Sequence, residues 1–118
     1  MKTILVIEDD PLTLTITENK LKKEGYKVFI STDGKDGLEK IESLKPDLVI
    51  TDIMMPYKSG VEITYYIKKN FPNIPVIVLS ALGEEEQTVI ETFKVGANDF
   101  IAKPFNLTEL ALRVKRLI

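Results

Sequence analysis

Short apolar runs alternate along the chain with longer segments in which apolar positions recur every three or four residues. The short runs are bounded by polar or turn residues, which is typical of buried strands in a parallel sheet. They predict strands at Thr3–Ile7, Tyr26–Ile30, Leu48–Thr51, Pro75–Leu79 and Phe100–Ala102. The longer segments have the stripe of an amphipathic helix. They predict helices at Pro11–Glu24, Lys35–Leu44, Gly60–Asn70, Glu84–Val95 and Leu107–Leu117.

The residues at the predicted helix ends agree with this pattern. Gly25 and Gly96 follow the first and fourth helices, where glycine is the common C-terminal cap. Asn106 precedes the last helix as an N-cap, and Glu109 three residues later predicts a capping box. Strands that alternate with helices form a parallel sheet with helices on both faces. We therefore predict a doubly wound α/β fold, as one domain over residues 1–118.

Composition narrows the chemistry that is open to this chain. A net charge of −2 gives no basic field for nucleic acid, and no apolar run approaches the roughly 18 residues of a membrane span. The absence of cysteine fits a cytoplasmic protein and excludes disulfides and thiolate metal sites. The absence of histidine excludes an internal phosphohistidine or an imidazole base. Any chemistry must use carboxylates, lysines and hydroxyls.

Carboxylates follow two of the predicted strands. Glu8, Asp9 and Asp10 come after the first strand, and Asp52 comes after the third. In doubly wound sheets these strand ends meet at the switch point, where ligands bind. Unit charges about 4 Å apart repel by roughly 4 kcal/mol at an effective dielectric near 20, so such a cluster predicts a bound cation. Mg²⁺ suits it best, because this ion takes one or two carboxylates together with water and phosphate oxygens.

Some of these acids have simpler explanations. Asp10 precedes Pro11, which is the usual start of a helix, and we favour an N-cap role for Asp10. One cap does not explain three acids, so Glu8 and Asp9 remain ligand candidates. Asp52 could cap the turn that follows it, although its place opposite Asp9 favours a role in the cluster.

A hydroxyl and an amine end two further strands. Ser80 ends the fourth strand, and Lys103 ends the fifth. Either residue alone is usually just solvated. With the acids they form a set that suits phosphoryl transfer, in which cations neutralise phosphate oxygens and an aspartate accepts the group.

Four segments occur in the order and at the spacing of a known family. They are Ile4–Asp10, Pro46–Pro56 with Gly60, Val78–Ala81 and Gly96–Phe105. Together they make the chain similar, over essentially its full length, to the receiver domain of bacterial two-component response regulators, of the chemotaxis-regulator type. The resemblance implies a flavodoxin-like (βα)5 fold whose five parallel strands lie in the order 2-1-3-4-5.

The resemblance also implies a phosphoacceptor and a metal site. Asp52 would accept a phosphoryl group from a sensor histidine kinase or a phosphotransfer protein. Asp52 and Asp9 would bind Mg²⁺ directly, Glu8 would act through water, and the Met54 backbone carbonyl would complete the protein ligands. The chain would not be a conventional enzyme, but it would catalyse its own phosphorylation and slow dephosphorylation.

Other residues would respond to the phosphoryl group. Ser80 and Lys103 would contact its oxygens, and the peptide bond between Lys103 and Pro104 would be cis, a conformation open in practice to proline alone. Phe100 would turn inward as Ser80 moves, and we expect this equilibrium to favour the active packing somewhat even without phosphate, because phenylalanine has no hydroxyl to satisfy. Ordinary core packing of Phe100 is the alternative.

The resemblance places the output surface on the fourth helix, fifth strand and fifth helix, where an output domain or partner protein would bind and a homodimer could form on phosphorylation. We expect Ile90, Phe93 and Ala97 to face inward, with Val89 to one side, and Leu112 to be exposed.

Two apolar residues predict a long-lived aspartyl phosphate. Met54 and Leu82 stand two residues after Asp52 and Ser80, and neither side chain can orient an attacking water.

Three other functions compete with this one. A phosphatase of the aspartate-nucleophile type would need an acid where Met54 stands. A flavin or nucleotide binder would need a glycine- and hydroxyl-rich loop after the first strand, where Glu8 and Asp9 would repel a phosphate. A receiver that serves only as a scaffold would not need the full set of acids, hydroxyl and lysine.

Overall fold

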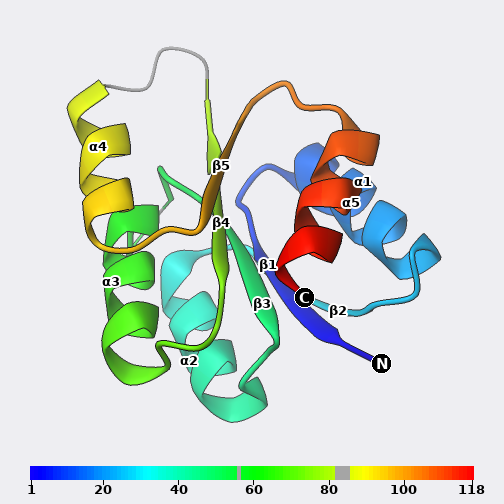
Figure 1. Ribbon diagram of the computed structural model, residues 1–118, viewed down its shortest axis with the longest axis horizontal. Coiled ribbons are helices and arrows are strands. Elements are labelled where there is room, and N and C mark those ends of the chain that lie inside the picture. The colour runs from blue at the N-terminus through cyan, green and yellow to red at the C-terminus, as the bar shows by residue number, and fades with distance from the viewer. Residues whose placement is uncertain (56, 82–85) are drawn as a thin grey trace.

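The computed structural model describes residues 1–55, 57–81 and 86–118, and it consists of alternating strands and helices (Figure 1). The elements in chain order are β1 (Thr3–Ile7), α1 (Pro11–Lys23), β2 (Lys27–Ser31), α2 (Gly34–Leu44), β3 (Leu48–Asp52), α3 (Gly60–Asn70), β4 (Val76–Ser80), α4 (Glu86–Lys94), β5 (Asp99–Ala102) and α5 (Leu107–Leu117). In the described residues, no helix has the length and apolar character needed to cross a membrane.

The five strands form one parallel sheet in the order β2-β1-β3-β4-β5, which confirms the predicted doubly wound fold. Helices α1 and α5 cover one face, and α2, α3 and α4 lie on the other (Figure 1). Successive residues of a strand point to opposite faces, so Ile4 and Val6 pack in one core and Leu5 and Ile7 in the other. Every apolar residue of β1 and β3 is fully buried.

Element bounds differ from the predicted ones by small shifts. The predicted bounds of β1, α3 and α5 are reproduced, whereas β2 lies one residue later in the chain. Strand β3 extends to Asp52 and β4 to Ser80, so these two candidate site residues are the last residues of their strands. Helix α4 is described from Glu86, and residues 84 and 85 of the predicted helix lie outside the described residues.

Side-chain caps fix the start of α1 and α5. Asp10 caps α1 as predicted, because its carboxylate accepts from the Thr13 backbone N–H at 3.0 Å. Asn106 caps α5 as predicted and accepts from the Glu109 N–H at 3.0 Å. The predicted capping box is wrong, since the Glu109 carboxylate accepts instead from the Arg113 guanidinium at 2.9 and 3.1 Å. A charged donor one turn along the helix has replaced the neutral N–H as its partner.

The reciprocal capping box occurs at α3, where the spacing of Ser59 and Glu62 in the sequence could have shown it. Gly60 starts this helix against the end of β3. A Cβ atom on Gly60 would lie 2.5 Å from the carbonyl oxygen of Asp52, so the close approach requires glycine. The box and the glycine together fix the start of α3 against the end of β3.

The expected orientation of α4 is partly wrong. Ile90 and Phe93 are 38% and 51% exposed, whereas Val89 packs against the core together with Ala97. The fully buried residue of α4 is Thr92, whose hydroxyl donates to a backbone carbonyl of its own helix at 2.8 Å. That internal bond satisfies the hydroxyl, so a polar residue can occupy the inward face of the helix. The apolar stripe therefore predicted the wrong face of α4 as the buried one.

Candidate functional site

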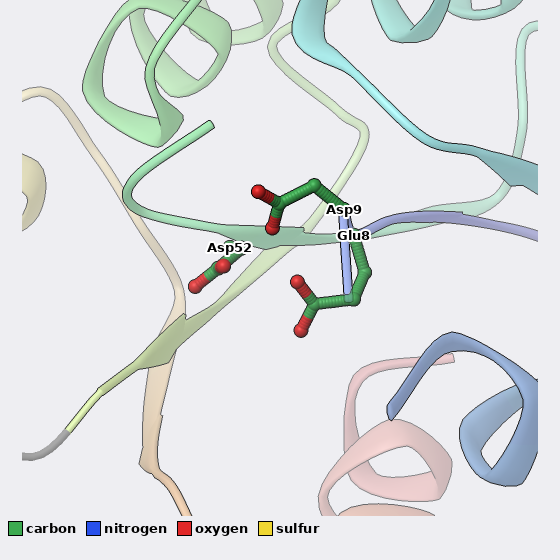
Figure 2. A group of neighbouring side chains, drawn as sticks. All are labelled: Glu8, Asp9 and Asp52. Carbon is green, nitrogen blue, oxygen red and sulfur yellow. The ribbon is translucent and has the colours of Figure 1, made fainter. Parts of the chain in front are cut away.

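Three carboxylates meet where β1 and β3 end (Figure 2). The parallel register pairs Ile7 with Thr51, so the next residues of both strands are neighbours. One oxygen from each of Glu8, Asp9 and Asp52 lies within 4.8 Å of the others. Glu8 is fully buried and Asp52 is 6% exposed, whereas Asp9 faces solvent. The structure therefore brings together the three acids that the sequence singled out.

A single lysine joins two of these acids. The ammonium of Lys103, in the loop after β5, lies 2.5 Å from Glu8 Oε1 and 3.2 Å from Asp52 Oδ2. Its backbone N–H donates to the Ser80 carbonyl at 2.7 Å, which continues the pairing of β4 and β5 beyond the last strand residue. The peptide bond between Lys103 and Pro104 is cis, the conformation that the resemblance implied. The contact with Glu8 was not foreseen from the sequence.

The Asp52 carboxylate is held from two sides. Oδ1 accepts from the Ile53 backbone N–H at 3.0 Å, and Oδ2 faces the Lys103 ammonium. The sequence was compatible with a role for Asp52 as a cap of the following turn, although it favoured a role in the acidic cluster. The structure contains both features, because one oxygen contacts the turn and the other contacts the lysine.

Burial and neighbouring charges shift the pKa values of the groups at this edge of the sheet. Burial raises the pKa of the Glu8 carboxyl, and the contact with Lys103 does not offset it while Asp52 adds repulsion. Burial and the neighbouring Glu8 also raise the pKa of Asp9. Burial alone would lower the pKa of the Lys103 ammonium, but Glu8 and Asp52 together outweigh it and raise that pKa. Lys103 thus pairs with two of the three carboxylates, and Asp9 adds a third negative charge beside them.

This donor set fits a hard divalent cation. Every donor in the cluster is a carboxylate oxygen, and such oxygens are the ligands that Mg²⁺ prefers. A cation would offset the repulsion among these carboxylates, which adds to burial in raising the pKa values of Glu8 and Asp9. Met54 lies in the loop two residues after Asp52, and its side chain is 62% exposed.

The remaining candidate residues lie on β4, β5 and the loop between β4 and α4. Ser80 is partly buried and pairs with Ala102. Phe100 pairs with Val78 and is partly buried in the core, and its ring centroid lies 4.6 Å from that of Phe93. Leu82 lies outside the described residues.

Comparison with known proteins gives the same family as the motifs. The family model described as "Response regulator receiver domain" matches residues 4–115. The alkaline phosphatase synthesis transcriptional regulatory protein PhoP of Bacillus subtilis (strain 168) is 34% identical over 117 residues. That match covers 99% of this chain and 48% of PhoP, so the chain spans about half the length of this curated relative.

Solved structures agree in fold and extent. The receiver domain of Francisella response regulator 1452 superimposes with a TM-score of 0.90 at 34% identity, over 99% of this chain and 96% of that one. A response regulator receiver domain protein from Clostridium thermocellum gives a TM-score of 0.93 at 31% identity, over 100% of this chain and 94% of that one. The chain therefore belongs to the response regulator receiver domains of two-component systems.

Proposed function

We propose that residues 1–118 act as one receiver domain, which accepts a phosphoryl group on Asp52 in a Mg²⁺-dependent reaction. The observation that carries this proposal is the setting of the Asp52 carboxylate. It lies at the end of a buried strand, fixed by the Ile53 N–H and the Lys103 ammonium and flanked by two further acids. Aspartate is a known covalent phosphoryl acceptor, and this site adds the charges that such a transfer requires.

The phosphoryl donor is a phosphohistidine of a sensor kinase or phosphotransfer protein. It lies on another protein because this chain has no histidine of its own. A carboxylate oxygen of Asp52 attacks the phosphorus and forms the new O–P bond. The P–N bond to the donor imidazole breaks, and its electron pair stays on the nitrogen. Lys103 supplies a fixed positive charge for the phosphoryl oxygens, and its raised pKa keeps it protonated at neutral pH.

Asp9 and Asp52 are the proposed direct ligands of Mg²⁺, together with the Met54 backbone carbonyl. Glu8 acts through water, and its contact with Lys103 supports this outer role because one of its oxygens is already occupied. When bound, the metal neutralises charge on the phosphoryl oxygens.

A hollow beside the site supports the approach of a protein donor. It has a volume of about 370 Å³ and lies between α1 and the loop after β5, lined by Thr13, Ile16, Lys103, Pro104 and Phe105. On the same helix the side chain of Leu12 is 71% exposed. An apolar surface next to Lys103 suits the helix of a partner that presents its phosphohistidine to Asp52.

The proposed output surface is formed by α4, β5 and α5, where it would contact an output domain or partner protein. Its exposed apolar residues are Ile90, Phe93 and Leu112, which suit an apolar partner. Its arginines are already engaged, because the Asp99 carboxylate pairs with Arg113 at 2.7 Å and with Arg116 at 3.0 Å. A phosphorylation-dependent homodimer through this surface would therefore rest more on apolar contact than on new salt bridges.

Intact-protein mass spectrometry tests the central step. After incubation with acetyl phosphate and Mg²⁺, the wild-type chain gains the mass of a single phosphoryl group, and an excess of chelator abolishes the gain. Asp52→Asn gains nothing, because an amide oxygen is a poor nucleophile. Asp47→Asn is the matched control and should be phosphorylated like wild type. Asp47 is exposed, and within the described part of the chain its carboxylate accepts a hydrogen bond from the Thr3 N–H alone. An adduct on Asp52→Asn would refute the assignment.

Phe100 tests the proposed switch. Because phenylalanine can turn inward without burying a hydroxyl, we expect wild type to sample the active packing more than Phe100→Tyr does. The measurement is the ¹H–¹⁵N spectrum of β4 and β5 with and without beryllofluoride, which mimics the phosphoryl group. Without it, the peaks of Phe100→Tyr should lie further from the beryllofluoride-bound positions than those of wild type. Unliganded spectra that coincide would contradict the proposal.

Met54 tests the proposed lifetime of the aspartyl phosphate. An amide at this position can orient an attacking water, so Met54→Asn should shorten the half-life of the phosphoprotein on the order of tenfold, equivalent to roughly 1.4 kcal/mol of barrier. Met54→Leu keeps the position apolar and should leave the half-life near that of wild type. The decay of the phosphorylated mass after removal of acetyl phosphate gives both values, and equal decay in all three proteins would rule out this role.

A further inference from the structure

A surface groove runs over α3, between Leu38 of α2 and Val95 after α4. These three helices lie on the face of the sheet opposite α1 and α5 (Figure 1). Its larger part has a volume of about 450 Å³, and its apolar lining consists of Leu38, Val61, Tyr65, Tyr66 and Val95. A second hollow of about 350 Å³ shares Tyr65 and Val95 with the first and is otherwise lined by lysines. We call the two hollows together the α3–α4 groove. Its volume suits one or two large apolar side chains.

Three lysines form one end of this groove: Lys68, Lys69 and Lys94. Among the described residues, none of the three forms an ion pair with a carboxylate. Glu62 is the one acid among the residues that line the described groove, and it is paired with Lys58 at 3.6 Å. The end formed by the three lysines is therefore positively charged, although the chain as a whole is acidic.

Each lysine is held in place or set at the end of a helix. The ammonium of Lys68 donates to the Ile74 carbonyl at 2.9 Å, and burial lowers its pKa. The ammonium of Lys69 lies 5.9 Å from the centre of the Tyr65 ring, within reach of a cation–π contact. Lys94 is the last residue of α4. Tyr65 is itself 55% exposed, so the apolar and the basic parts of the groove meet at an accessible aromatic ring.

We propose that the α3–α4 groove binds an acidic segment of a protein partner, in which a large apolar side chain stands beside aspartate or glutamate. The apolar lining takes the side chain, and the lysines pair with the carboxylates. A flat anionic membrane would meet the lysines but could not reach the apolar lining of a concave groove. Lys94 and Val95 place one edge of the groove at the end of α4, beside the proposed output surface, and binding in the groove does not require phosphorylation.

A random dodecapeptide phage library tests this proposal, with the immobilised wild-type chain as bait. The expected result is enrichment of peptides in which Asp or Glu flanks Phe, Tyr, Trp or Leu. The doubly substituted chain Lys69→Glu, Lys94→Glu should bind the enriched peptides at least tenfold more weakly in fluorescence anisotropy. The doubly substituted chain Lys2→Glu, Lys23→Glu is the control, because it changes the net charge equally at exposed positions outside the groove. Its affinity should match that of wild type.

Amide chemical shifts locate the bound peptide, and they should change at Tyr65 and Val95. Equal melting temperatures of the two doubly substituted chains show that both fold. The proposal is overturned if the enriched peptides lack acidic residues, if the two substituted chains bind them equally, or if the shifts change on α1 and α5 instead. It is also overturned if phosphatidylglycerol vesicles sediment the chain while no library peptide is enriched.

Discussion

The contact of one lysine with two buried acids is the interaction around which the candidate site is built. Lys103 approaches Glu8 at 2.5 Å and Asp52 at 3.2 Å, and Asp9 adds a third carboxylate without a cation of its own. Charges at such separations interact by roughly 5 to 7 kcal/mol per pair at an effective dielectric near 20. The site therefore has fewer positive charges than carboxylates. A divalent cation can supply the missing positive charge, which would also neutralise the oxygens of a phosphoryl group.

The rest of the fold positions these groups. Parallel pairing of β1 and β3 brings the acids together, because their carboxyl ends lie at the same edge of the sheet. Pairing of β4 and β5 continues through the N–H of Lys103, so that the lysine crosses the same edge. Gly60 and the Ser59–Glu62 capping box fix the start of α3 against the end of β3. Placing like charges together costs stability, and natural proteins commonly accept that cost at functional sites.

Much of this arrangement could be predicted from local patterns. Apolar runs and helical stripes gave the order of strands and helices, and strand order alone put Asp9 opposite Asp52. The contact between Lys103 and Glu8 could not be predicted, because it depends on the path of the loop after β5. The orientation of α4 was missed for another reason. Thr92 satisfies its hydroxyl within the helix, so a polar residue faces the core while Phe93 faces solvent.

Thermal unfolding with and without Mg²⁺ tests most directly whether the cluster of Glu8, Asp9 and Asp52 binds a divalent cation. In metal-free buffer Asp9→Asn should melt at a higher temperature than wild type, because it removes one of the repelling carboxylates. At Mg²⁺ tenfold above the dissociation constant, wild type should gain about 1.4 kcal/mol of stability and Asp9→Asn almost none. If wild type gains no stability from Mg²⁺, or if Asp9→Asn gains as much, the account of this site is wrong.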